Sequence, residues 1–247
     1  MIQRDGIYMS QNVMITGTGR RSALGFNLVL RYLEAGDNVV ATIRKESKDL
    51  SELKEKYGKK LHIVFMDIGS TESVERAASQ VENEVGRLDL LINNAVLSAL
   101  GMDEDFLHAD MDSILETFNV SALGTMRVMK AFYPLLKKGE GMSLIINISS
   151  EAGSITKCFR SNYLDYAMAK AAVNMGTMTF YNATKDDPGI NIFCVHPGWI
   201  RTDGREDNPA PLSSYEAAET LRLLFEKRRY DKQGHRFITY ENEDYPF

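Results

Sequence analysis

The chain has 247 residues, of which 44% are hydrophobic and 26% are charged, a composition typical of one globular α/β domain. Its 29 Lys and Arg against 34 Asp and Glu give a net charge of −5, which leaves no basic excess for binding a nucleic acid. Two cysteines, Cys158 and Cys194, exclude a disulfide framework and have no metal-ligand spacing, so we expect a reducing, cytoplasmic location.

Residues 1–11 are a polar extension without an apolar signal core, and no stretch of the chain is long enough to span a membrane. Beyond the extension, short apolar runs alternate with stretches of helical period. We predict strands over 13–16, 39–43, 61–66, 88–92, 144–148, 190–195 and 237–240. Helices are predicted over 24–33, 50–57, 74–85 and 166–184, with one or two over 110–136 and a last one from the capping box Ser213/Glu216 to about Arg229.

This alternation predicts a single domain over residues 1–247, built as a doubly wound, Rossmann-like parallel sheet of about seven strands with helices on both faces. Ligands of such sheets bind at the carboxyl ends of the strands. The longest connections at that edge are 96–110 and 198–214, and we expect the second to lie on the substrate side. Both loops mix apolar residues with acids, which indicates a mostly apolar substrate pocket.

The first predicted strand leads into the segment TGTGRRSALG, residues 16–25, and then into a helix. A turn of this kind brings backbone N–H groups and the positive end of a helix to a pyrophosphate. Glycines also end strands for steric reasons, and the usual tight spacing is absent here. Because this is the first strand-to-helix turn of a doubly wound chain, we favour a dinucleotide site.

The residues after the second strand bear on the choice of cofactor. A carboxylate at this point would bind a ribose 2′-hydroxyl, but here Arg44 and Lys45 follow the strand. Arg20 and Arg21 in the first loop add two more cations. Positive charge that converges on this point favours NADP(H) over NAD(H), although a solvated basic turn is the alternative interpretation.

Tyr166 and Lys170 stand at positions i and i+4 of a predicted helix and therefore share one of its faces. The pKa of a tyrosine is ordinarily about 10, and a nearby ammonium favours the phenolate that acid–base chemistry at neutral pH requires. Such a pair is also common as a core aromatic beside a surface lysine. Tyr163 has Ala167 at i+4, so Tyr166 is the paired phenol of the two.

Two further polar residues belong to this hypothesis. Ser150 follows the fifth predicted strand, where its hydroxyl can bind a substrate carbonyl or simply end the strand. Asn119 lies inside a predicted helix, where an amide is unfavourable unless it faces solvent or bridges the backbone to water beside Lys170. No nucleophile motif occurs, and we expect no metal site from the four scattered histidines, His62, His108, His196 and His235.

Together these residues resemble the short-chain dehydrogenases/reductases from about Val13 to the C-terminus. The resemblance is carried by an ordered set of loose motifs: Ile15-Thr16-Gly17, Asp67-Ile68, Asn93-Asn94-Ala95, Asn119, Ser149-Ser150 with Gly153, Tyr166 with Lys170, and the run from Pro197 to Thr202. Within the family the chain looks most like the C-factor and sniffer-type carbonyl reductases.

The resemblance implies roles for the matching positions. Tyr166 would be the general acid or base, Lys170 would lower its pKa and hold the nicotinamide ribose, Ser150 would orient the carbonyl, and Asn119 would hold a proton-relay water. The implied cofactor contacts are Gly17, Gly25, Asp67, Ile68, Asn94, Ala95, Tyr166, Lys170, Ile200 and Thr202. The chain departs from the family in a loop two residues longer, in Ala23 and Val96 where glycine is usual, and in extra residues between 154 and 165.

We therefore expect an NADP-dependent oxidoreductase that interconverts a carbonyl and an alcohol of a small molecule by hydride transfer. A dinucleotide-sensing or signalling protein of low turnover is the alternative, motivated by the altered loop. A third hypothesis is a structural partner protein, with Met168, Met175 and Met178 pairing across a two-fold axis, although core packing explains such residues more often. Homodimers or higher homo-oligomers are compatible with each of these.

Overall fold

The computed structural model describes residues 2–4, 7–97, 105–202 and 208–247. Its strands are β1 Ile2–Arg4, β2 Ile7–Met9, β3 Asn12–Thr16, β4 Asn38–Ile43, β5 Leu61–Phe65, β6 Leu90–Asn93, β7 Ser143–Ile148, β8 Ile190–His196, β9 Ile200–Arg201, β10 Leu212–Ser213 and β11 Phe237–Thr239. Its α-helices are α1 Leu24–Glu34, α2 Lys48–Tyr57, α3 Thr71–Glu84, α4 Ile114–Thr117, α5 Gly124–Leu136, α6 Leu164–Thr184 and α7 Ser214–Arg228.

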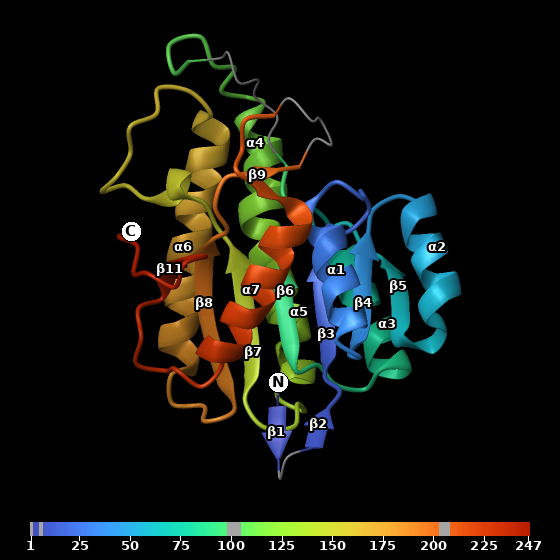
Figure 1. Ribbon diagram of the computed structural model, residues 1–247. Coiled ribbons are helices and arrows are strands. Elements are labelled where there is room, and N and C mark those ends of the chain that lie inside the picture. Colours follow the sequence, from blue (N-terminus) through green and yellow to red (C-terminus); the bar gives the residue numbers. More distant parts are fainter. Residues whose placement is uncertain (1, 5–6, 98–104, 203–207) are drawn as a thin grey trace.

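Seven strands form one parallel sheet in the order β11-β8-β7-β6-β3-β4-β5 (Figure 1). The order reverses at β3, so the crevice expected of a doubly wound sheet lies beside the end of this strand. Alternate residues of β3 face opposite layers: Val13 and Ile15 pack with α1 and α7, and Met14 packs with α3 and α5. The predicted doubly wound sheet with helices on both faces is confirmed.

The stretch 110–136, for which one or two helices are predicted, contains three helical segments. The α4 helix passes into a π-helical segment, η2, at Phe118–Leu123, and α5 then continues to Leu136. A π-helical turn inserts an extra residue and often marks a functional position, and here it contains Asn119. A helical period could not predict this segment, because a π-helical turn adds only one residue to the α-helical spacing.

Three other predictions can be compared with the structure: the capping box, the polar extension and the loop over 198–214. The capping box is confirmed, since the Ser213 hydroxyl accepts from the backbone of Glu216 and the Glu216 carboxylate accepts from the backbone of Ser213. The predicted polar extension contains an antiparallel hairpin of β1 and β2. The loop predicted over 198–214 carries the short parallel pair β9 and β10, while its residues 203–207, like 98–104 of the other long loop, lie outside the described residues.

At the opposite edge of the sheet, Arg229 joins α7 to the amino ends of the strands. Its fully buried guanidinium donates to the carbonyls of Asp89 and Met142, to Gln11, and to both carboxylate oxygens of Glu226. Burial acts to raise the pKa of Glu226, but Arg229 and Gln11 outweigh it and hold this pKa at about 2. The carboxylate therefore stays ionised and paired at any pH near neutrality.

This network makes the stability of the protein depend on acid pH. Because the pKa of Glu226 is about 2 when folded against an ordinary 4.5, its contribution is complete above pH 4.5 and is lost as the pH falls toward 2. We expect Glu226→Gln to lower the free energy of unfolding at pH 7 by about 3 kcal/mol, and by progressively less below pH 4.5. Urea denaturation of both proteins across this range measures the difference, and a difference independent of pH would contradict the assignment.

Candidate active site

The turn between β3 and α1 is packed so closely that two of its positions need glycine. Gly17 has a φ of +72°, and a Cβ built on it would lie 2.6 Å from the Cα of Ala95. A Cβ built on Gly25 would lie 2.4 Å from the carbonyl oxygen of Gly17. The structure thus brings Gly17 and Gly25 into contact across the longer loop, and the added residues do not open the turn.

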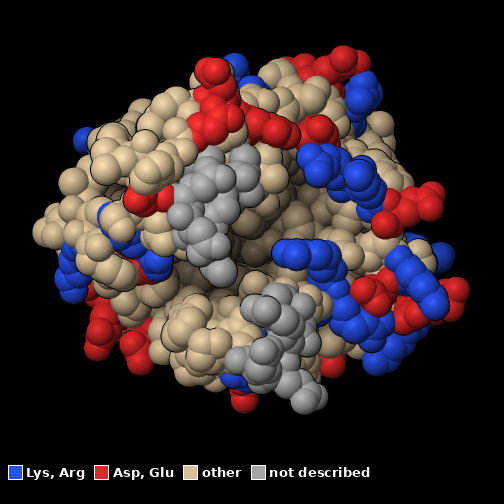
Figure 2. All heavy atoms as spheres, turned by 90° about the horizontal axis from the view of Figure 1, so that it is seen from above, with Lys and Arg blue, Asp and Glu red and all other residues tan. Residues whose placement is uncertain are grey.

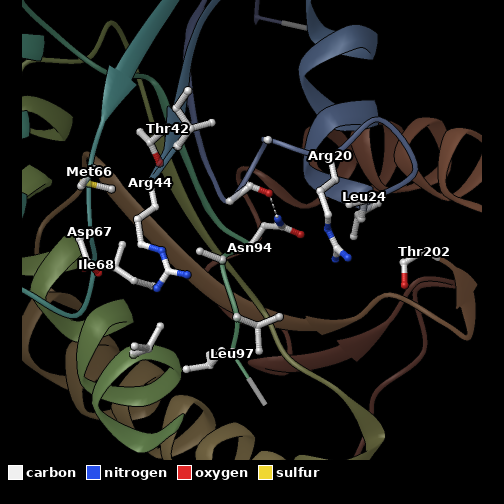
Figure 3. A pocket seen from close by; sticks show the side chains of 17 residues that line it. Arg20, Leu24, Thr42, Arg44, Met66, Asp67, Ile68, Asn94, Leu97 and Thr202 are labelled. Atoms are coloured by element: carbon white, nitrogen blue, oxygen red, sulfur yellow. Dashed lines mark hydrogen bonds between the residues drawn. The ribbon is translucent and has the colours of Figure 1, made fainter. Parts of the chain in front are cut away.

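Side chains of β3 and the segment after β6 fix this turn. The Thr16 hydroxyl accepts from the backbone N–H groups of Asn94 and Ala95, both at 3.0 Å. The Asn94 amide in turn donates to the carbonyls of Thr16, at 2.9 Å, and Gly17, at 3.1 Å. The turn borders a pocket that is also lined by residues following β4, β5 and β6, among them Arg44, Asp67 and Leu97 (Figure 3).

A pocket of about 390 Å³ lies at this edge of the sheet. Seen from above, the edge is hollowed, with Lys and Arg side chains gathered along one side of the hollow (Figure 2). The predicted cofactor residues that line the pocket are Gly17, Arg20, Arg44, Asp67, Ile68, Asn94, Ala95 and Thr202. Ala23 and Val96, which replace the glycines usual in the resembling family, line it too. The pocket therefore accommodates both departures at its wall.

The predicted cations do not all converge on one point. Arg44 lies with Asp67 and Ile68, whereas Arg20 lies on the opposite side of the pocket with Leu24 and Thr202 (Figure 3). Consistent with this placement of Arg20, the nearby Ser22 hydroxyl donates to the carbonyl of Thr202 at 2.9 Å. Both arginines are exposed. The pocket thus offers positive charge at two separate positions.

Five predicted cofactor residues are not part of the pocket lining: Arg21, Gly25, Ile200, Tyr166 and Lys170. Arg21 turns to α2, where it pairs with Asp49 at 2.8 Å and Glu52 at 2.6 Å, so its expected place beside Arg44 is wrong for this structure. Gly25 packs beneath Gly17, as described above. The side chain of Ile200 is half-buried against the core layer of α1 and α7.

Tyr166 and Lys170 lie near the start of α6, on the face that the i and i+4 spacing predicts. The Lys170 ammonium is 5.4 Å from the centroid of the Tyr166 ring, and it donates to the carbonyl of Ile148 at 2.6 Å. The lysine is almost fully buried, and burial lowers its pKa to about 8. The amine is therefore still mainly protonated at neutral pH.

Tyr166 differs from the expectation in its acidity. Burial raises the pKa of its phenol above the ordinary value, and a hydrogen bond with Ser150 offsets this only in part. Lys170, whose ammonium donates to the carbonyl of Ile148 at 2.6 Å, does not reverse this rise. The phenol is thus held as a neutral acid, next to the hydroxyl that the sequence placed beside it.

Asn119 is held by Gly69 and Arg127, which are not among the predicted catalytic residues. Its amide nitrogen donates to the carbonyl of Gly69 at 3.1 Å. Its amide oxygen accepts from Arg127 at 2.7 Å, and its backbone carbonyl accepts from the same guanidinium at 3.0 Å. The structure therefore shows Asn119 bracing the π-helical segment against Arg127, in place of the predicted bridge beside Lys170.

A charged cluster beside Ser150 was missed by the sequence reasoning. Glu151 accepts a hydrogen bond from Ser150 at 2.5 Å, pairs with Arg160, and lies 3.6 Å from the imidazole of His196. The one available signal was a carboxylate directly after the predicted serine. Its partners come from a loop nine residues on and from the end of β8, and no spacing rule joins them.

Among the described residues, no helix is both long enough and apolar enough to cross a bilayer. Within that same part of the chain, no three His, Cys, Asp or Glu side chains are grouped so that they could hold a metal ion. Cys158 is exposed and Cys194 is buried, and neither forms a disulfide.

Comparison with known proteins gives one consistent result. A family model described as short chain dehydrogenase matches residues 11–212. An uncharacterised oxidoreductase of Schizosaccharomyces pombe is 32% identical over 192 residues, covering 76% of this chain and 74% of that protein. The NADPH-bound carbonyl reductase from chicken fatty liver is 27% identical with a TM-score of 0.84, over 97% of this chain and 100% of that one. The carbonyl reductase Sniffer of D. melanogaster has the same coverage and a TM-score of 0.85, and at 23% identity this likeness concerns the fold.

Proposed function

The chain belongs to the short-chain dehydrogenase family and is an oxidoreductase, and from this premise we propose that it interconverts a carbonyl and an alcohol with NADP(H). The observation that carries the proposal is the buried Lys170 ammonium, which lies 5.4 Å from the centroid of the Tyr166 ring and is fixed by the carbonyl of Ile148. A neutral phenol in this position is a proton donor for a carbonyl oxygen.

The residues at the strand ends fit a phosphorylated dinucleotide. Gly17 and Gly25 let the turn between β3 and α1 pack closely against itself and Ala95, and this turn forms the pocket wall where a pyrophosphate would lie. Arg44 follows β4, the position that faces a 2′-substituent in this fold, and Arg20 offers a second positive charge across the pocket. The NADPH bound to the chicken carbonyl reductase supports the same choice.

Each predicted catalytic residue then has a task. When bound, the nicotinamide cofactor supplies the hydride for the carbonyl carbon. Tyr166 gives its proton to the carbonyl oxygen, and Ser150 positions the reacting group against the phenol. Lys170, fixed by the carbonyl of Ile148, keeps positive charge beside the proton donor. Asn119 holds the π-helical segment in place through Arg127.

Titration with NADPH and NADH, followed by fluorescence, and turnover on a panel of carbonyl compounds test this proposal. We expect tighter binding of NADPH and consumption of NADPH with ketone or aldehyde substrates. Failure to bind either cofactor would overturn the proposal. Tight binding without turnover on any carbonyl would overturn it in favour of the sensing protein that the longer loop suggested.

Two secondary expectations stay predictions. The free cysteines suit a reducing, cytoplasmic compartment. Self-association is supported by Met168 and Met175 on α6, whose exposed fractions are 45% and 68%, so core packing does not account for either. Light scattering of the purified chain would determine its oligomeric state.

A further inference from the structure

The guanidinium of Arg127, on α5, bonds to two segments at the edge of the pocket. In the β5–α3 turn (residues 66–71), the Thr71 hydroxyl accepts from its Nε at 3.1 Å, and the Ile68 carbonyl accepts from its Nη1 at 3.3 Å. In the π-helical segment η2, the backbone carbonyl of Asn119 accepts from Nη1 at 3.0 Å, and the side-chain oxygen of Asn119 accepts from Nη2 at 2.7 Å. One side chain can bridge both segments because a guanidinium carries five donors in a rigid plane.

The β5–α3 turn and η2 also contact each other directly. The amide nitrogen of Asn119 donates to the carbonyl of Gly69 at 3.1 Å. A Cβ built on Gly69 would lie 3.3 Å from Cγ2 of Val120. Gly124, where η2 passes into α5, is so close to the turn that a Cβ built on it would lie 2.9 Å from the carbonyl oxygen of Ile68. Glycines thus let the two segments meet, and the bonds of Arg127 fix how they are spaced.

Both segments contribute side chains to the wall of the pocket. Asp67 and Ile68 of the turn line it, and so does Val120 of η2. Arg44, which would face a 2′-phosphate, lies with Asp67 and Ile68 (Figure 3). The adenosine end of a bound dinucleotide would therefore lie against this wall. Arg127 is not one of the lining residues, so its effect on a cofactor would pass through the wall that it fixes.

We infer that Arg127 is a positioning residue for the cofactor, because it fixes η2 against the β5–α3 turn and so holds the wall of the adenosine end in place. The inference rests on the proposed function and adds to it a residue that the sequence reasoning did not select. Without the guanidinium, the carbonyls of Ile68 and Asn119 lose a charged donor, and binding must then order the wall. The affinity for the cofactor should fall, whereas hydride transfer at the other end of the dinucleotide should not change.

Arg127→Met tests this directly, since methionine retains part of the aliphatic stem and has no donor. We expect the Kd for NADPH to rise about 10-fold or more, with kcat at saturating NADPH within about two-fold of the unmodified protein. Arg127→Lys keeps the charge on a single ammonium that cannot serve both segments at once, so its Kd should lie between these two values. An Arg127→Met protein with an unchanged Kd for NADPH would overturn the inference.

Two further ligands identify the part of the cofactor that Arg127 affects. Adenosine 2′,5′-bisphosphate has the adenosine end of NADPH without the nicotinamide, so Arg127→Met should weaken its binding by the same factor as that of NADPH. NADH differs from NADPH by the 2′-phosphate alone, so its Kd should rise by this factor as well, and the ratio of the two Kd values should stay constant. An Arg127→Met protein that bound the bisphosphate normally, or that lost its preference for NADPH, would contradict the assignment.

Arg31→Met is the matched control for a general loss of stability. Arg31 is also partly buried, and it joins α1 to α7 through Glu34 at 3.1 Å and Glu219 at 3.7 Å, outside the pocket lining. We expect its Kd values to equal those of the unmodified protein. An equal rise in Kd for Arg31→Met would overturn the inference, because lost stability would then account for the effect of Arg127→Met.

The unmodified protein separates this inference from the proposed function. If it binds neither NADPH nor NADH, the proposed function fails, and the inference fails with it. If it binds NADPH and the Arg127→Met protein binds NADPH equally well, the inference alone fails.

Discussion

Replacing Tyr166 with phenylalanine is expected to lower kcat for carbonyl reduction by about 10²- to 10⁴-fold, with the affinity for NADPH unchanged. Phenylalanine keeps the ring near the start of α6 and removes only the hydroxyl, so the packing around the site is preserved. The loss then falls on the chemical step, because the variant removes the proposed proton donor. Steady-state consumption of NADPH and a fluorescence titration measure the two quantities separately.

The pH dependence of the unmodified protein should identify the same group. Burial lowers the pKa of Lys170 to about 8, and burial raises that of Tyr166 above its ordinary value. Reduction needs both groups protonated, so kcat/KM should decline first above pH 8 and again at a higher pH, where the buried phenol of Tyr166 loses its proton. The Tyr166→Phe protein should lack the second decline, since phenylalanine does not titrate.

Tyr181→Phe is the matched control for this variant. Tyr181 lies on the same helix, and its phenol donates to the carbonyl of Lys232 at 3.3 Å, so the change removes one hydroxyl outside the site. We expect its kcat to equal that of the unmodified protein. A Tyr166→Phe protein that still reduced carbonyls at the rate of the unmodified protein would exclude the phenol as the proton donor.

The strands of this fold could be predicted from the sequence because they are short, apolar and buried on both faces. The runs over 39–43 and 144–148 match β4 and β7 to within one residue. The capping box at Ser213 was predictable for a related reason, since both of its partners lie within one helical turn. Local rules succeed where the interacting residues are neighbours in the chain.

The features that escaped prediction depend on residues far apart in the sequence. The pairing of β9 with β10 joins two segments of two residues each, too short for a periodic signal. The direction of Arg21 was decided by Asp49 and Glu52, which stand 28 and 31 residues later. The neighbouring residues Arg20 and Arg21 therefore point in different directions. Arg21 lies against α2, and Arg20 lines the pocket.

The candidate site also combines features that local spacing predicts with features that depend on distant residues. The identity of Tyr166, Lys170 and Ser150 followed from spacing and strand position, whereas their hydrogen-bond directions did not. Whether Ser150 donates or accepts depends on Glu151, and the orientation of Glu151 depends on Arg160 and His196. Sequence reasoning can therefore name candidate groups before it can state which of them carries the proton.

Replacing Arg44 with aspartate is expected to lower the ratio of kcat/KM with NADPH to that with NADH by about 10²-fold or more. The change removes a cation that would pair with a 2′-phosphate and introduces a carboxylate that repels it. The same carboxylate can accept a hydrogen bond from the 2′-hydroxyl of NADH, so both effects move the ratio in one direction. Initial rates with each cofactor on one carbonyl substrate give the ratio.

The other two arginines make this test specific for position. Arg20 lies across the pocket with Thr202, away from the end of β4, so Arg20→Ala should weaken both cofactors and leave the ratio unchanged (Figure 3). Arg21 pairs with Asp49 and Glu52 on α2, and Arg21→Ala should change neither affinity. An Arg44→Asp protein that kept its preference for NADPH, or an Arg20→Ala protein that lost it, would mean that the 2′-phosphate binds on the Arg20 side of the pocket.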